Sequence, residues 1–152
     1  MLNPQPAARR ILVAHKQHIA NAGMQGALDS SRLALLVDCC DPSHPYFASL
    51  LAGAHLLVTD YSNGIEACRK LQRVPLPGRE RQPSVMIVSN RDGEVAIRHA
   101  FEAGVKGYVL LSADLDAFVD GVERVYAGER FVCGRPCEMQ IAKSATITRA
   151  RC

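Results

Sequence analysis

Short apolar runs alternate along this chain with segments in which apolar residues recur at helical spacing. The apolar runs span four to six residues each, which is typical of buried strands in a parallel sheet. They lie at residues 11–14, 33–38, 56–59, 85–89 and 107–111. The clearest helical stripe covers residues 115–126, where Asp114 is a good N-cap and Gly128 a good stop. The pattern predicts alternating strands and helices.

Three further helices are expected at residues 43–52, 64–73 and 92–103. The first follows Asp41-Pro42, a pair that favours a turn and then a helix start, and the last stops at Gly104. Strands that alternate with helices of about ten residues imply βαβ crossovers. We therefore predict an α/β, flavodoxin-like, doubly wound sheet of five parallel strands with helices on both faces.

The composition is that of one globular domain: 152 residues, 48% hydrophobic and 22% charged. There is no run of about 18 apolar residues that would span a bilayer, and no signal-peptide pattern at the N-terminus. We expect a cytoplasmic protein without a membrane partner. The net charge of +3 is mild and the cations are scattered, so charge alone does not argue for nucleic acid.

The cysteines are interpreted first as free thiols, because no secretion signal is evident and the chain is long enough for a core. They are Cys39, Cys40, Cys68, Cys133, Cys137 and Cys152. The Cys133-x-x-x-Cys137 pair lacks the second pair or histidines of a zinc finger, so no metal site is expected. Arg135 lies between these two cysteines, which keeps open a thiol redox sensor that uses this pair or Cys39-Cys40.

Polar residues stand where the predicted strands end. Asp60 ends the third strand, in His55-Leu-Leu-Val-Thr-Asp60, and Ser89 ends the fourth. His15 and Lys16 follow the first strand. In an open α/β sheet, functional groups collect at the carboxyl ends of the strands. His15, Lys16 and Asp60 are therefore expected at one rim of the sheet.

Residues 10–130 resemble the receiver domain of NarL/FixJ (LuxR-type) response regulators. The resemblance is carried by residues 100–111, Ala-Phe-Glu-Ala-Gly-Val-Lys-Gly-Tyr-Val-Leu-Leu, and residues 127–131, Ala-Gly-Glu-Arg-Phe. It implies the CheY-like strand order 2-1-3-4-5. It also makes Asp60 the equivalent of the phosphoacceptor, Ser89 of the switch hydroxyl and Tyr108 of the switch aromatic residue.

The other residues that serve phosphorylation in that family are replaced here. His15 and Lys16 stand where two acidic residues help to hold Mg²⁺, and Leu111 stands where a lysine pairs with the phosphoryl oxygens. Neither His15 nor Lys16 offers Mg²⁺ an oxygen ligand, and phosphoryl transfer needs cations that offset the moving charge. We therefore expect a degenerate receiver, or pseudo-receiver, that is not an enzyme, has no cofactor and binds Mg²⁺ weakly or not at all.

Three of these side chains carry two interpretations each. The Lys16 ammonium would pair with Asp60 and replace the metal charge, or it would extend into water while Asp60 caps a loop. Ser89 and Tyr108 would act as a switch that links the site to helix 4, strand 5 and helix 5. Alternatively, Ser89 satisfies a strand-end backbone group and Tyr108 packs with its hydroxyl toward water.

The expected organisation is an N-terminal extension at residues 1–9, a receiver-like domain at 10–130 and a tail or linker at 131–152. In the resembled subfamily a DNA-binding helix-turn-helix domain follows the receiver. This tail is too short for one, so direct DNA binding by this chain is not expected.

The predicted function is a phosphorylation-independent regulatory module in signal transduction or transcription control. It would bind a protein partner or form a homodimer, through helix 4, strand 5 and helix 5 or through helices 1 and 5. A conventional phosphoacceptor at Asp60 and a cysteine redox sensor are the alternatives.

Overall fold

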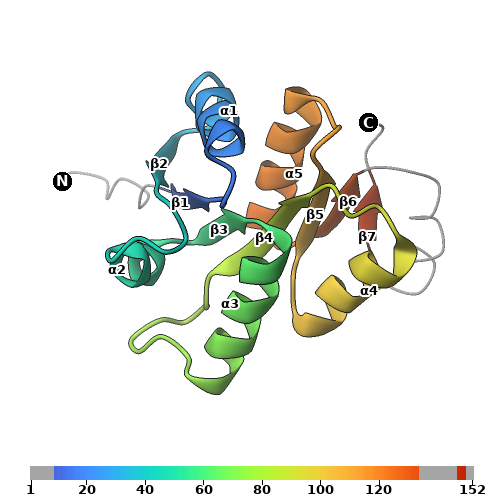
Figure 1. Cartoon of the computed structure of the whole chain (residues 1–152). Coiled ribbons are helices and arrows are strands. Elements are labelled where there is room, and N and C mark those ends of the chain that lie inside the picture. The colour runs from blue at the N-terminus through green and yellow to red at the C-terminus, as the bar shows by residue number, and fades with distance from the viewer. Residues whose placement is uncertain (1–8, 134–146, 150–152) are drawn as a thin grey trace.

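The computed structural model describes residues 9–133 and 147–149 (Figure 1). Its strands form one parallel sheet in the order β2-β1-β3-β4-β5-β6-β7. The strands are β1 (Arg9–Ala14), β2 (Leu35–Cys39), β3 (Leu56–Thr59), β4 (Ser84–Ser89), β5 (Gly107–Leu110), β6 (Arg130–Cys133) and β7 (Ile147–Arg149). The helices are α1 (His18–Asp29), α2 (Phe47–Gly53), α3 (Tyr61–Arg73), α4 (Glu94–Ala103) and α5 (Leu115–Tyr126).

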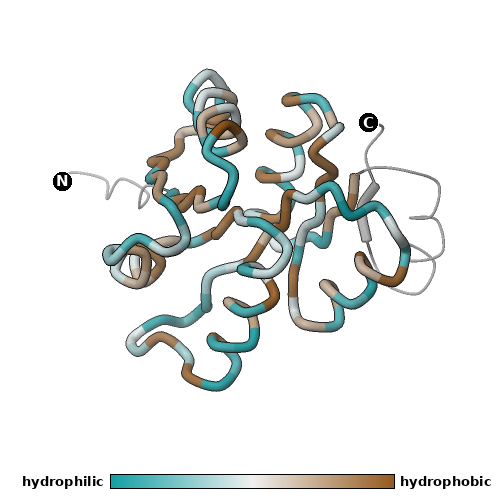
Figure 2. Tube along the Cα trace, viewed as in Figure 1, coloured by the Kyte–Doolittle hydropathy of each residue, from teal (hydrophilic) through white to brown (hydrophobic). Residues whose placement is uncertain are grey.

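The helices cover both faces of the sheet, with α1 and α5 on one side and α2, α3 and α4 on the other (Figure 1). Successive strand residues point to opposite faces, so Leu12 packs toward α3 and α4 while Ile11 and Val13 pack toward α1 and α5. The apolar colour of Figure 2 accordingly follows the central strands. The predicted flavodoxin-like fold and the order 2-1-3-4-5 are confirmed.

Two helix starts differ from the prediction for local reasons. α2 begins at Phe47 rather than residue 43, because the Asp41 carboxylate accepts the Ser43 N–H in a turn and Pro45 disfavours helix before it. α3 begins at Tyr61 rather than residue 64, because Asp60 itself is the N-cap. Within the described ranges, no helix has the length and apolar character to cross a membrane.

The sheet continues beyond the five predicted strands. β6 pairs in parallel with β5, where Gly107 lies opposite Phe131, and β7 pairs with β6. Phe131, Val132 and Cys133 are all fully buried. β6 begins at the predicted boundary between the receiver-like domain and the tail. An apolar run of three residues was too short to predict a strand.

Close packing between α5 and β6 depends on a glycine. A Cβ added at Gly121 would lie 2.6 Å from Cε1 of Phe131 and 3.1 Å from Cε of Met86. Because glycine has no Cβ, the Phe131 ring lies directly against the helix backbone. The sixth strand is therefore an integral part of the core rather than an appended segment.

Candidate functional site

The site residues predicted from the strand ends line one small pocket at the carboxyl edge of the sheet. The pocket has a volume of about 140 Å³, and its lining includes His15, Lys16, Asp60, Ser89 and Leu111. The ends of β1, β3, β4 and β5 bring them together, as expected for parallel strands that end at the same edge.

The Asp60 carboxylate is buried, and its oxygens are engaged by hydrogen bonds. The side-chain amide of Asn63 donates to Oδ1 at 2.8 Å and to Oδ2 at 3.0 Å. The backbone N–H of Lys16 donates to Oδ1 at 3.2 Å, and that of Asn63 to Oδ2 at 3.4 Å. Burial raises the pKa of the Asp60 carboxyl, but the bonds from Asn63 and Lys16 outweigh it, so the pKa lies below the ordinary 3.8.

His15 is buried, and both of its ring nitrogens are engaged. Nδ1 lies 3.0 Å from the backbone N–H of Gln17, and Nε2 lies 2.9 Å from the carbonyl oxygen of Val88. A backbone N–H only donates and a carbonyl only accepts, so these contacts fit the His15 tautomer with its proton on Nε2. Asn21 further holds the His15 backbone, accepting its N–H at 2.6 Å and donating to its carbonyl at 2.7 Å. His15 is therefore a structural residue here.

The Lys16 side chain is exposed and forms no ion pair with any residue that the structure describes. Its contact with Asp60 is made by the backbone N–H instead. The hypothesis that the Lys16 ammonium replaces the metal charge is therefore wrong. The backbone and the Asn63 amide stabilise the Asp60 carboxylate in its place.

The residues at this rim do not fit Mg²⁺. Asp60 supplies a single carboxylate, and Mg²⁺ prefers several oxygen ligands in octahedral geometry. Across residues 9–133, no three His, Cys, Asp or Glu side chains gather in a group suited to a metal ion. Leu111, where the resemblance expects a lysine, presents a 38% exposed apolar side chain to the pocket.

Ser89 and Tyr108 both hold the backbone of Arg91, in the loop after β4. The Ser89 hydroxyl oxygen accepts the Arg91 N–H at 3.1 Å, and the Tyr108 hydroxyl donates to the Arg91 carbonyl at 2.7 Å. Burial raises the pKa of the Tyr108 phenol to about 12, against an opposing hydrogen bond with Ser89. The Tyr108 hydroxyl thus points to the backbone, not to water as the packing interpretation supposed.

Three residues at this edge were missed from the sequence. Arg91 places its guanidinium 4.5 Å from the ring centroid of Tyr61, and Tyr61 donates its hydroxyl to the carbonyl of Ala96 at 2.8 Å. Asn63 was missed as well, because an asparagine at the third helical position is not part of the usual capping box, which has Glu or Gln there. The Tyr61 and Tyr108 rings meet edge to face, 6.3 Å between centroids.

The described cysteines give little support to thiol chemistry. Cys39, Cys40 and Cys68 are free, and burial raises the pKa of each thiol, that of Cys68 to about 11. A raised pKa lowers the reactive thiolate fraction. Cys133 is disulfide-bonded, so the expectation of a free thiol is wrong there. Cys137 and Cys152 lie outside the described residues.

The chain has the fold of response-regulator receiver domains. The isolated receiver domain of RcsB from Salmonella enterica serovar Typhimurium superposes with a TM-score of 0.72 at 15% identity, covering 89% of this chain and 98% of that one. A LuxR-family response regulator from an Aurantimonas species gives 0.68 at 23% identity, over 91% and 98%. The response regulator ChrA of a heme-sensing two-component system gives 0.63 at 24%, over 95% and 69%.

At the level of sequence the likeness is local. The transcriptional regulatory protein DegU of Brevibacillus brevis is 34% identical over 71 residues, which is 46% of this chain and 28% of that protein. The chain therefore matches under a third of this relative's length. No known family model matches the sequence.

Proposed function

We propose that this chain is a pseudo-receiver of the NarL/FixJ type: a regulatory interaction module that works without Mg²⁺-dependent phosphorylation of Asp60. It would act in signal transduction or transcription control through a protein partner or a second copy of itself. It would be cytoplasmic and would need no cofactor.

One observation carries this proposal: both oxygens of the Asp60 carboxylate already accept hydrogen bonds from donors of the protein. The amide of Asn63 spans both oxygens, and two backbone N–H groups occupy further lone pairs. A phosphoacceptor must expose one oxygen to the incoming phosphorus and another to the metal. Here both would first have to lose hydrogen bonds, and among the described residues no group of three His, Cys, Asp or Glu side chains is placed to hold the metal.

The test is intact-mass spectrometry after incubation with Mg²⁺ and acetyl phosphate or phosphoramidate. We expect no phosphoryl mass gain in the natural chain. The gain-of-function control is the variant His15→Asp, Lys16→Asp, Leu111→Lys, which restores the family's charges, combined with Asn63→Ala, which uncovers the Asp60 oxygens. Thermal unfolding verifies its fold, because His15 is a buried structural residue. The negative control is Asp60→Asn, which keeps the shape of the side chain. A mass gain in the natural chain that Asp60→Asn abolishes would establish the conventional phosphoacceptor instead.

Of the two predicted dimer surfaces, the one formed by α1 and α5 has the stronger support. β6 pairs along β5 at Gly107, Tyr108 and Val109, so β5 is not an edge strand. The groove between α1 and α5 is lined by Gly23, Gly26 and other small residues of α1. Leu115 lines it from α5 and is 54% exposed, which makes it the natural apolar contact for a second copy.

Sedimentation velocity distinguishes the two surfaces. Leu115→Glu should shift the chain from dimer toward monomer, because the charge would be buried without a partner. Val95→Glu is the matched control, since Val95 is an exposed apolar residue of α4, 80% exposed. A shift caused by Val95→Glu alone would move the interface to α4, and a concentration-independent monomer would remove the dimer from the proposal.

A further inference from the structure

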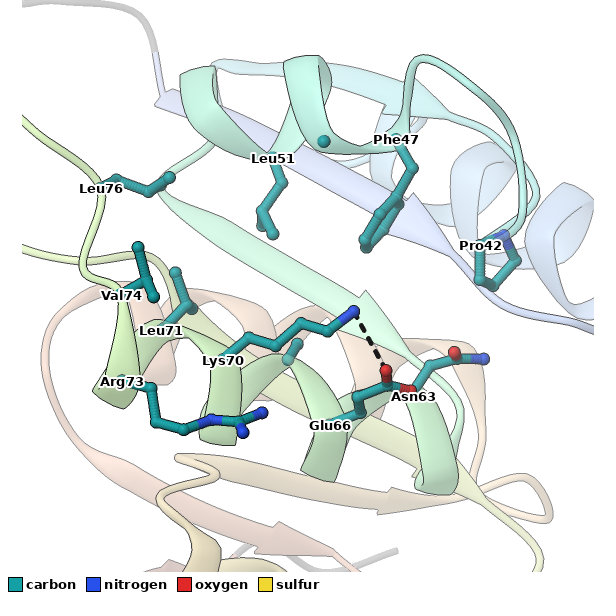
Figure 3. A pocket seen from close by; sticks show the side chains of 12 residues that line it. Pro42, Phe47, Leu51, Asn63, Glu66, Lys70, Leu71, Arg73, Val74 and Leu76 are labelled. Atoms are coloured by element: carbon teal, nitrogen blue, oxygen red, sulfur yellow. Dashed lines mark ion pairs between the residues drawn. The ribbon is translucent and has the colours of Figure 1, made fainter.

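A hollow of about 560 Å³ lies between α2 and α3 (Figure 3). Its walls carry Phe47 and Leu51 from α2, Leu71 from α3, and Val74 and Leu76 from the segment after α3. In Figure 3 the α2 side chains point toward those of α3 and its following segment, with open space between them. Sites for small molecules typically have volumes of about 300–1,000 Å³ and apolar walls.

The α2 wall of the hollow is only loosely packed. No residue of α2 is fully buried, and Phe47 and Leu51 are half-buried. Both side chains thus present apolar surface that a bound molecule would remove from water, at roughly 25 cal/mol per Å². This area is a driving force for binding that the folded chain leaves unused.

The third wall is fixed by hydrogen bonds. The Gln82 amide accepts the backbone N–H of Leu76 at 2.7 Å and donates to its carbonyl at 3.0 Å. Arg79 donates to the carbonyl of Ala52 at 2.8 Å, which ties the same segment to α2. The segment after α3 therefore frames the hollow in a defined position.

The polar rim of the hollow is cationic. Its charged lining residues are Lys70, Arg73 and Glu66, and Glu66 pairs with Lys70 at 3.0 Å. Arg73 forms no ion pair within the described part of the chain. Two cations against one carboxylate leave an unmatched positive charge beside an apolar cavity, and a guanidinium is well suited to a carboxylate.

We propose that the hollow between α2 and α3 binds a small amphipathic carboxylate, such as a medium-chain or aromatic acid. Its apolar body contacts Phe47, Leu51 and Leu71, and its carboxylate accepts hydrogen bonds from Arg73 beside Lys70. Asn63 also lines this hollow, and its amide holds Asp60, so the bound acid borders the rim pocket as well. The site does not depend on the proposed function, because it uses neither phosphorylation nor dimerisation.

Isothermal titration calorimetry of the full chain with decanoate, decanol and decylammonium tests the ligand chemistry. We expect saturable binding of decanoate and at least about tenfold weaker binding of the other two, since a charge-assisted hydrogen bond is lost. No saturable binding of decanoate, or equal affinity for decanol, would overturn the proposal of a carboxylate site.

Matched variants test the location. Arg73→Glu should weaken decanoate binding about tenfold or more. Arg69→Glu should not, although it makes the same charge change on an exposed residue of the same helix that does not line the hollow. Ala48→Trp, which fills the hollow, should abolish binding, whereas Ser49→Trp beside it should not. Equal effects within either pair would refute this location, and thermal unfolding of each variant verifies the fold.

Discussion

The side-chain amide of Asn63 donates to both carboxylate oxygens of Asp60, at 2.8 and 3.0 Å. The two residues stand at the N-cap and third position of α3, so the helix start itself provides the donor that covers the aspartate. A residue that resembles a phosphoacceptor by sequence thus acts as a helix cap by structure.

This capping role predicts a stability effect at Asp60. Asp60→Ala should lower the free energy of unfolding by about 2–3 kcal/mol, a helix cap plus the donors left unsatisfied in a buried site. The matched control is Asp114→Ala, which removes an exposed cap whose Oδ1 accepts the Ala117 N–H at 2.7 Å, and should cost about 1 kcal/mol. Urea denaturation measures both. Equal losses would mean that the Asn63 and Lys16 contacts contribute little.

The lowered pKa of the Asp60 carboxyl predicts a pH dependence. Ionised Asp60 stabilises the fold above the unfolded pKa of about 3.9, and this contribution is lost as the pH falls through the lower folded pKa. The stability difference between the natural chain and Asp60→Asn should therefore shrink below that pH. Asp41, whose pKa hydrogen bonds from Ser43 lower to about 2, titrates in both proteins and cancels. A pH-independent difference would contradict the charge argument.

Replacement by alanine should lower the free energy of unfolding strongly at His15 and hardly at all at the adjacent Lys16. His15→Ala opens a buried cavity and leaves the Gln17 N–H and the Val88 carbonyl without their hydrogen-bond partner. The free energy of unfolding should fall by about 2–4 kcal/mol. Lys16→Ala should change stability by less than about 0.5 kcal/mol, because only its backbone contacts Asp60. Chemical denaturation of both variants decides this, and a large loss for Lys16→Ala would restore a side-chain role.

The Tyr108 phenol should ionise at a higher pH than a tyrosine in water. Its pKa of about 12 means that the neutral phenol stabilises the fold below its ordinary pKa of 10.0, and this contribution is lost as the pH rises toward 12. Tyr108→Phe should remove a step near pH 12 from an ultraviolet absorbance titration. It should also cost about 1 kcal/mol for the lost bond to Arg91. Loss of a step near pH 10 instead of near pH 12 would place the Tyr108 hydroxyl in water.

Because the residues of β6 after Arg130 are buried, we predict that the folded unit extends past residue 130. Phe131→Ala should lower the free energy of unfolding by about 3–5 kcal/mol, because the ring is fully buried against Gly121. Val95→Ala, at an exposed position, should change it by less than about 0.5 kcal/mol. Thermal or urea unfolding compares the two. A small loss at Phe131 would indicate that β6 is dispensable.

The strands could be predicted because each is a continuous apolar run bounded by turn or helix residues. The run at residues 56–59 and the stripe at 115–126 match β3 and α5 in the structure. β6 was not predicted because its burial comes from pairing with β5. A run of three apolar residues does not indicate such a tertiary contact. At the rim, the sequence predicted that His15, Lys16 and Asp60 lie together, but it did not predict which side chain contacts Asp60. Only the distances in the structure show that this partner is the Asn63 amide and not the Lys16 ammonium.

No residue of α2 is fully buried, whereas each of the other helices on the sheet has fully buried residues. The α2 amide hydrogens should exchange with solvent through local opening, at a free energy well below that of global unfolding. The helix can therefore detach and return while the strands beneath it stay paired. A molecule bound in the hollow between α2 and α3 would therefore slow amide exchange at residues 47–53, without any change elsewhere in the fold.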